Sequence, residues 1–367
     1  MEHSARDRWV LAVQAVLLVA VMLYLAGCTF LNGTPTVGFS YAPVTCFTDV
    51  PVAFRASTTG IGIDDVTAFS WTFGDGTTAM GQDVEHTYSR AGEYSAVLVA
   101  TLPNGESVSA SRRIVVSAGL VVPSAYGTIQ SAIDAAEDGD TIIVMPGSYV
   151  ETLTIAGKTI TVQSSNPADQ RVVDSTVIRG FEPGRPTVRF GSGAHGTLAG
   201  FTLLTGPVQE PYCGACFGIV YVREAAPTIQ QNRIVNAPDA GMVIYESAAH
   251  IDGNRFIGNT STASGGAIYV DCYRHAPTIS GNTFEDNTAD SGGAIFITAT
   301  AANDPTAGGS AMTLVTGNTF RNNTATQFGG GAIFVEFAGN LRLDSPDSNS
   351  YSGNDPDDVF YVVAPSS

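Results

Sequence analysis

The sequence predicts an all-β protein in which a β-sandwich is followed by a solenoid of stacked strands, and three observations predict this fold class. Apolar segments that begin with glycine recur through the C-terminal half, at Gly218, Gly241, Gly266, Gly293 and Gly331. Asparagines followed two positions later by an isoleucine or an aromatic residue recur in step with them, at Asn232, Asn254, Asn282, Asn318 and Asn349. Short alternating strands separated by turn residues occupy the region before residue 118. Repeats of this length are typical of solenoids.

The composition indicates an ordered, turn-rich protein rather than one that binds nucleic acid. The 367 residues are 44% hydrophobic, include 40 glycines and carry a formal net charge of -17. Lys158 is the only lysine, and the basic residues do not form a cluster that could attract nucleic acid or anionic lipid. We therefore expect no nucleic-acid partner.

Residues 1–27 are expected to be a signal peptide. Arg6 and Arg8 precede an apolar run from residue 9 to residue 25, which is the layout of a secretory signal. The run ends in Leu-Ala-Gly-Cys at residues 25–28, which resembles the lipobox of bacterial lipoproteins. This resemblance implies that Cys28 is lipidated and that the protein is exported and anchored to the outer membrane or cell surface. A plain transmembrane anchor is the alternative, because the run is at the lower limit for a membrane span.

After a linker at residues 28–35, residues 36–117 are expected to form a β-sandwich. Phe69, Trp71 and Phe73 alternate with polar residues, and Asn104-Gly105 predicts a hairpin between two later strands. The segments Trp-Thr-Phe-Gly-Asp-Gly at 71–76, His-Thr-Tyr at 86–88 and Gly-Glu-Tyr at 92–94 resemble the PKD domain, an immunoglobulin-like module. The resemblance implies a spacer or adhesion module without catalysis, in which His86 is structural.

Residues 120–367 are expected to form the solenoid, beginning with a short capping helix. Residues 127–136 predict an amphipathic helix with Thr128 as its N-cap, placed where it can cover the open end of the core. A strand follows at residues 141–145. The segment from Thr128 to Val162, including Pro-Gly-Ser-Tyr-Val-Glu at 146–151, resembles the opening of right-handed parallel β-helix proteins of the pectate lyase-like superfamily.

The recurring asparagines predict ladders of hydrogen bonds along the solenoid. Equivalent residues on successive turns lie about 4.8 Å apart, so buried amide side chains can bond from turn to turn while aromatic residues stack inside. A further asparagine stands at the fifth position after most members of the series, at Asn259, Asn287, Asn323 and Asn354. We therefore expect two parallel ladders.

No catalytic residue, metal or cofactor is assigned from the sequence. Gly-Ser-Tyr-Val-Glu at 147–151 matches an element of pectin methylesterases, but the later elements that carry their acid, base and nucleophile are missing. A polysaccharide lyase would need a cationic base or calcium, and no two of the candidate cations form an assignable motif: Arg223, Arg255, Arg274 and His275. The acidic segments at 344–347 and 355–358 lack the spacing of a calcium loop. A lyase or carbohydrate esterase remains the alternative function.

The leading functional hypothesis is noncatalytic polysaccharide binding on one outer face of the solenoid. Counted from each repeat glycine, the second and fourth positions are expected to point inward and the third and fifth outward. The outward third positions are Tyr221, Ile244, Tyr269, Phe296 and Phe334, and the outward fifth positions are Arg223, Glu246, Asp271, Thr298 and Glu336. Aromatic rings beside polar groups suit a sugar-binding surface. Coverage by the insertion at 299–311 is one alternative, and a purely structural or adhesive role is another.

Three cysteines of the solenoid region are expected to form a structural link. Cys213-x-x-Cys216 and Cys272-x-x-His275 lie about two coils apart, roughly 10 Å along the axis. In an exported protein a disulfide from Cys272 to Cys213 or Cys216 is the default. A zinc site of three cysteines and one histidine, or free thiols, are the alternatives.

Overall fold

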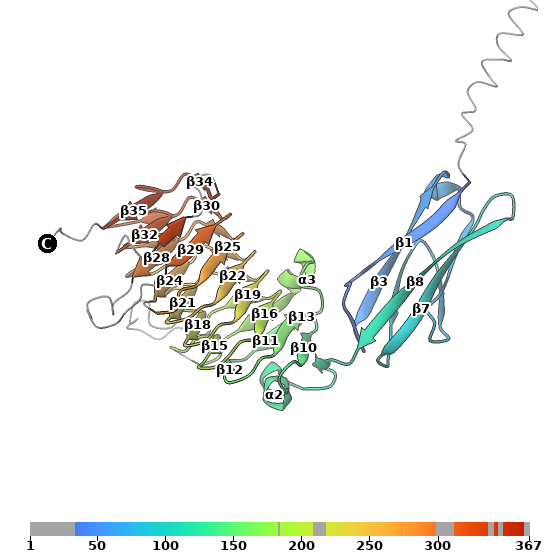
Figure 1. Ribbon diagram of the computed structural model, residues 1–367, viewed down its shortest axis with the longest axis horizontal. Helices are drawn as coiled ribbons and strands as arrows, with labels where there is room; N and C mark the ends of the chain where they lie inside the picture. The colour runs from blue at the N-terminus through green and yellow to red at the C-terminus, as the bar shows by residue number, and fades with distance from the viewer. Residues whose placement is uncertain are drawn as a thin grey trace, which may run out of the picture. The chain divides into compact units, whose positions relative to one another are not determined.

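The computed structural model describes residues 34–182, 184–207, 218–272, 274–298, 312–336, 341–343 and 348–362. The chain divides into two compact units, which are described separately here. The first consists mainly of residues up to 115, and the second mainly of the residues from 116 onward. Figure 1 shows strands throughout both units, so the predicted all-β class is confirmed.

The first unit is an immunoglobulin-like β-sandwich of two sheets. One sheet has the order β1-β3-β6, with β1 (Thr36–Ala42), β3 (Pro51–Thr59) and β6 (Asp83–Thr87). The other has the order β2-β8-β7-β4-β5, with β2 (Cys46–Phe47), β8 (Ser107–Ser117), β7 (Gly92–Thr101), β4 (Ala68–Thr72) and β5 (Thr78–Met80). A 3-10 turn, η1, spans Ile63–Asp65. Trp71 and Phe73 are fully buried between the sheets, and β7 and β8 are neighbours joined at Asn104-Gly105, as the sequence predicts.

His86 packs into the turn that follows β4 and serves a structural role there. Its ring stacks on Phe73 with centroids 4.1 Å apart, and its Nε2 lies 2.8 Å from Oδ2 of Asp75. Burial favours a higher pKa for Asp75, but hydrogen bonds from Thr77 and His86 outweigh it and lower that pKa below its ordinary value. The charged carboxylate therefore holds the turn in place.

The second unit is a right-handed parallel β-helix whose coils each contribute one strand to three parallel sheets (Figure 1). The first sheet contains β9 (Leu120–Val122), β10 (Thr141–Val144), β13 (Thr161–Ser164), β16 (Thr197–Ala199), β19 (Thr228–Gln230), β22 (His250–Asp252), β25 (Thr278–Ser280), β29 (Thr313–Thr316) and β33 (Leu341–Leu343). The second sheet contains β11 (Gly147–Val150), β14 (Thr176–Arg179), β17 (Thr202–Leu204), β20 (Arg233–Val235), β23 (Arg255–Ile257), β26 (Thr283–Glu285), β30 (Thr319–Arg321) and β34 (Ser350–Ser352). The third sheet contains β12 (Leu153–Ile155), β15 (Val188–Phe190), β18 (Val220–Arg223), β21 (Met242–Tyr245), β24 (Ile268–Asp271), β28 (Ile295–Thr298), β32 (Ile333–Val335) and β35 (Val359–Tyr361). A short pair, β27 (Thr288–Ala289) and β31 (Thr324–Ala325), and the helix α3 (Gln170–Ser175) complete the unit.

Helix α2 (Ile129–Ala135) packs its apolar side against the first coils, as predicted. Thr128 is its N-cap and forms a capping box with Ser131. Both carboxylate oxygens of Glu151 accept hydrogen bonds from the free backbone N–H groups of the first turn, at Ile129 and Gln130. The carboxylate of Glu151 therefore provides acceptors for the free N–H groups at the N-terminal end of α2, and its negative charge interacts favourably with the helix dipole.

The other end of α2 is held by the one lysine of the chain. Nζ of Lys158 donates to the carbonyl oxygens of residues 133, 134 and 136 at 2.7 to 2.9 Å. A cation at this end neutralises the partial negative charge of the last carbonyl groups. The segment around Glu151, which matches an esterase element in sequence, therefore anchors a helix in this protein. Tyr149 of the same element donates its hydroxyl to the carbonyl of Met145.

Both predicted asparagine ladders are present, and every member except Asn354 is buried. In the first ladder, Oδ1 of each asparagine accepts the backbone N–H of the asparagine one coil earlier, at distances of 2.8 to 3.0 Å through Asn232, Asn254, Asn282, Asn318 and Asn349. The second ladder runs in the same way through Asn259, Asn287, Asn323 and Asn354. These bonds satisfy the backbone where each coil turns a corner.

The interior of the β-helix is aliphatic, with one column of aromatic rings. Phe256 stacks on Phe284 at 5.0 Å, Phe284 on Phe320 at 4.8 Å, and Phe320 on Tyr351 at 5.2 Å between ring centroids. Ile268 and Ile295 are fully buried in the same core. The predicted internal stack is therefore confirmed.

Candidate functional site

The outer face of the third sheet carries a continuous column of side chains in register. From the first coil to the last, the paired positions are Thr154, Arg189, Tyr221, Val243, Tyr269, Phe296, Phe334 and Phe360. Their neighbours along the strands, such as Val220 and Val222, belong to the inner core. Strand alternation therefore directs this column outward. We call it the outer column.

The predicted register is wrong by one residue in the repeat that begins at Gly241. Val243, not Ile244, pairs with Tyr221 and Tyr269, and Ile244 lies in the inner core. The residue that occupies the glycine position of this repeat is Ala240, which has a φ of 57° where Gly218 has 60°. An alanine in the left-handed conformation is unusual, and because Gly241 follows it directly, the glycine pattern in the sequence points to the next residue.

The same shift changes the second outward column. Tyr245, predicted to point inward, stands between Arg223 and Asp271 in register, and Glu246 falls outside the column. The backbone N–H of Arg274 donates to the Glu246 carboxylate at 3.0 Å, so Glu246 holds the following turn. The column continues through Thr298 to Glu336, and the Thr298 hydroxyl donates to the Glu336 carboxylate.

The aromatic rings of the outer face fall into two arrangements. Phe296 and Phe334 lie parallel, 5.2 Å apart, and are only 8% and 6% exposed, so neighbouring rings cover their faces. Tyr245 lies at 51° to Tyr221 and at 55° to Tyr269, with centroids 5.8 and 5.9 Å apart. Tyr245 and Tyr269 are half-buried. Tyr221, Tyr245 and Tyr269 form what we call the tyrosine row. Tyr221 is 8% exposed, so Tyr245 and Tyr269 are the two rings that offer more surface than Phe296 and Phe334.

Tyr269 keeps its proton over the whole physiological pH range. Burial first, and then the negative charges of Asp271 and Glu336, raise the pKa of its hydroxyl. A phenol in this state can donate a hydrogen bond. The tyrosine row thus combines apolar ring surface with hydrogen-bonding groups.

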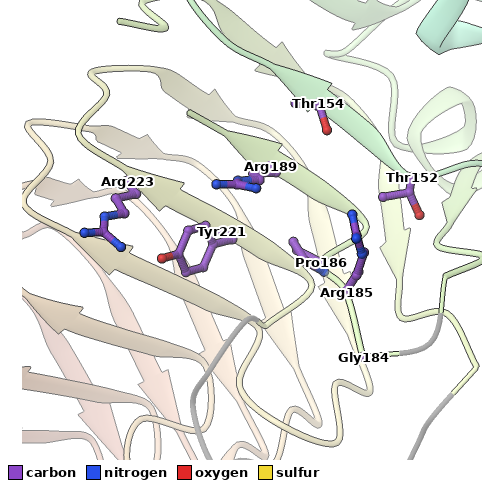
Figure 2. Close-up of a pocket in the computed structure, with 8 residues that line it drawn as sticks. All are labelled: Thr152, Thr154, Gly184, Arg185, Pro186, Arg189, Tyr221 and Arg223. Atoms are coloured by element: carbon purple, nitrogen blue, oxygen red, sulfur yellow. The ribbon is translucent and has the colours of Figure 1, made fainter. Parts of the chain in front are cut away.

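A cleft of about 510 Å³ opens where the outer column begins. The polar and aromatic residues that line it come from four separate segments and are Thr152, Thr154, Arg185, Arg189, Tyr221 and Arg223. Figure 2 shows Arg189 and Arg223 on either side of Tyr221, with Arg185 and Thr152 across the cleft. The guanidinium carbon of Arg189 lies 5.9 Å from the centroid of the Tyr221 ring, within the range of a cation–π contact.

The three arginines of the cleft differ in how their charge is compensated. Arg185 pairs with Glu182 at 2.9 Å, and Arg223 pairs with Glu224 at 3.4 Å. Arg189 makes no ion pair with any other residue that the structure describes. The hydroxyl of Thr152 is buried and has no hydrogen-bond partner within the described part of the chain. Among the described residues, Arg189 is therefore the one arginine of the cleft without an ion pair.

Sequence reasoning found Tyr221 and Arg223 but missed the other cleft residues. Arg189 precedes Tyr221 by one coil in the outer column, yet its strand lacks the glycine-led motif that marks later coils. Arg185 and Thr152 lie outside strands, and no repeat places them.

The remaining candidate residues are partly outside the described chain. Cys272 forms no disulfide with the other described cysteine; it is 2% exposed, its sulfur lies 3.9 Å from the carbonyl oxygen of Ser247, and burial raises its pKa to about 12. Cys213 and Cys216 lie outside the described residues, as do Cys28 and the insertion at 299–311. The disulfide, the zinc alternative and the lipid anchor therefore remain predictions.

Within the part of the chain that the structure describes, no group of three or more histidine, cysteine, aspartate or glutamate residues is placed to hold a metal ion. Among the described helices, none has the length and apolar character needed to cross a membrane.

Two family matches account for much of the chain. Residues 32–117 match the PKD domain family, and residues 214–337 match the family described as periplasmic copper-binding protein (NosD). No curated protein matches the chain significantly.

Solved structures similar to this chain fall into the same two groups. The PKD1 domain of the Vibrio cholerae metalloprotease PrtV is 23% identical and covers 23% of this chain and 99% of that one, with a TM-score of 0.20. Pectin methylesterase from Aspergillus niger is 13% identical and covers 68% of this chain and 86% of that one, with a TM-score of 0.42. A structure from work on carbohydrate-binding modules of the β-sandwich superfamily is 25% identical over 29% of this chain, with a TM-score of 0.22. The match spans 38% of that protein's chain.

Proposed function

We propose that this chain, a PKD domain followed by a right-handed parallel β-helix, is a surface-anchored lipoprotein that binds cell-surface or extracellular polysaccharide without catalysis. The observation that carries the proposal is the cleft of about 510 Å³ at the head of the tyrosine row on the third sheet. Sugar-binding sites combine ring surfaces with a few directed polar groups. Tyr221, Tyr245 and Tyr269 supply the rings, and the arginines and Thr154 of the cleft supply the polar groups.

The residues that the sequence predicts as sugar contacts differ in how directly they would contact the ligand. Tyr269 is a central contact together with Tyr245, which the corrected register brings to the same face, and Tyr221, at 8% exposure, contributes where it lines the cleft. Asp271 and Glu336 border the row as hydrogen-bonding groups. Phe296 and Phe334 continue it with ring edges, because their faces are stacked on one another. Glu246 lies outside the column and is left out of the proposed site.

A lyase or esterase is the competing function, and the geometry of the charged residues favours binding over it. Arg223 and Asp271 share a column, but Tyr245 stands between them, so they are not adjacent partners for acid–base chemistry. The carboxylate of Glu151, in the segment that matches an esterase element, is engaged with helix α2.

Replacing Tyr245 and Tyr269 together with alanine should weaken polysaccharide binding by roughly tenfold or more. Each ring contact contributes on the order of 1 kcal/mol beyond area burial, and both rings are half-buried, so the coil should stay folded. Binding would be measured by affinity electrophoresis in gels that contain neutral or acidic polysaccharides. Thermal melting would confirm that the variant is folded.

The control for this test is Tyr94→Ala, a half-buried tyrosine of the β-sandwich, which should leave binding unchanged. Unaltered affinity in a folded Tyr245→Ala/Tyr269→Ala variant would move the site away from this face. If the native protein bound none of the polysaccharides, the structural or adhesive role would replace the proposal.

Lipid anchoring is tested by Cys28→Ser. The native protein should incorporate labelled fatty acid and sediment with membranes, because the thiol of Cys28 carries the lipid. The variant should lose the label. A Cys28→Ser protein that still incorporates fatty acid would refute the assignment of the anchor.

A further inference from the structure

The charges on the outer face of the third sheet are separated along the solenoid axis. Arg185, Arg189 and Arg223 line the cleft at one end, in a chain whose formal net charge is -17. Asp271 and Glu336 stand in the same column as Arg223, toward the C-terminal end. Strands in a sheet are about 4.8 Å apart, so the four steps from Arg223 to Glu336 span about 19 Å. Glu182 and Glu224 pair with two of the three arginines, so among the described residues Arg189 carries the remaining positive charge at this end. The face therefore changes from the positive charge of Arg189 to the negative charges of Asp271 and Glu336 over a short distance.

The positive end is suited to a single anionic group. A guanidinium presents several N–H donors in a plane and matches the oxygens of a carboxylate or sulfate. Arg189 has no acidic partner among the described residues, so an anion beside it would supply the missing charge. The hydroxyl of Thr154, on the exposed side of its strand, is an additional donor that lines the same cleft. Tyr221 lines the cleft with the 8% of its surface that is exposed and gives the ring of the same sugar a small apolar contact.

The negative end excludes a second anionic group nearby. Carboxylates held beside Asp271 and Glu336 would face like charges on a partly buried surface, where repulsion is weakly screened. The same carboxylates raise the pKa of the Tyr269 hydroxyl, after the larger effect of burial, so their field extends to the ligand face. A polymer that carries an acid on every sugar would meet this repulsion along the tyrosine row.

We infer that this protein selects a polysaccharide in which acidic sugars are sparse, with one acidic residue in the arginine cleft and neutral residues along Tyr245 and Tyr269. The inference rests on the proposed function and names its ligand class. Specificity against uniformly acidic polymers comes from the repulsive end, and specificity against neutral polymers comes from the cleft.

The test compares three polymers as probes: gellan, which carries one glucuronate per repeat unit, polygalacturonate, which is acidic at every sugar, and dextran, which is neutral. The native protein should bind gellan at least about tenfold more tightly than either of the others. The double variant Arg189→Gln/Arg223→Gln should reduce gellan binding to the level of dextran. Gellan binding by the native protein should also weaken as salt is added.

The matched control is Arg233→Gln/Arg255→Gln, which removes the same charge. These two arginines occupy the same register position on neighbouring strands of the second sheet, and they line a separate small cavity of about 130 Å³. The control should bind gellan as the native protein does. A second variant, Asp271→Asn/Glu336→Gln, removes the repulsive end and should raise polygalacturonate binding severalfold.

Each alternative result is decisive. Equal binding of dextran and gellan by the native protein would overturn the inference and leave the proposed function standing. Binding of polygalacturonate as tight as that of gellan, or an equal loss in the cleft variant and the control, would also overturn it. Failure of the native protein to bind any of the three, or any other polysaccharide, would overturn the proposed function as well.

Discussion

Replacing Asn282 with alanine should lower the free energy of unfolding of the β-helix by at least about 3 kcal/mol. Asn282 is 1% exposed and lies in the middle of the first ladder. Its Nδ2 donates to the carbonyl oxygens of Ile251 and Ser280 and to Oδ1 of Asn318 at 2.8 to 3.0 Å. Its Oδ1 accepts from the backbone and side chain of Asn254. Alanine would leave these buried groups without partners, and each such group costs about 1 to 3 kcal/mol.

Two further variants separate the hydrogen bonds from the volume of the side chain. Asn282→Asp keeps the shape but loses the amide donor and buries a charge, so it should destabilise at least as much as alanine. Thr283→Ala, at the next position and on the outer side of the coil, should change stability by less than about 1 kcal/mol. Urea unfolding of the full chain followed by circular dichroism would measure all three. A cost below about 1 kcal/mol for Asn282→Ala would show that the ladder is dispensable.

Phe284→Ala should cost about 3 to 5 kcal/mol, whereas Phe296→Ala should cost about 1 to 2 kcal/mol. The Phe284 ring is fully buried between Phe256 and Phe320, so its removal leaves a closed cavity inside the solenoid. The Phe296 ring lies on the outer face of the third sheet, where neighbours can close over the gap or water can enter it. The cavity contribution is therefore smaller at Phe296.

The comparison between these two substitutions tests the assignment of the faces. Both remove the same ring from a stack of parallel rings in neighbouring coils, so each is the control for the other. The midpoint of urea unfolding would be measured for the native chain and for each variant. A Phe296→Ala variant as unstable as Phe284→Ala would mean that the outer column is part of a closed core, and the proposed ligand face would then be confined to the cleft.

The repeats made the coil architecture predictable because each coil must satisfy the same physical requirements. A parallel coil needs an inward apolar pattern of period two and a partner for every backbone group at its corners. Asn282 supplies the hydrogen-bond partner at a corner, and Phe284 supplies an inward apolar side chain. Both roles follow from their positions in the repeat. The one register error arose at Ala240, where an alanine adopts the left-handed conformation that glycine adopts more easily. A pattern of residue types cannot reveal that exception.

The sequence by itself determined the two units, the capping helix, the ladders and the alternation of inner and outer faces, because all of these follow from local propensity and periodicity. Only the tertiary structure decided the arginine cleft. Thr152, Arg185, Arg189 and Arg223 belong to different coils or to the turns between them, and no spacing in sequence relates them. They meet because stacking of the coils fixes the distance between strands, while the length of each turn decides which side chains reach over the sheet.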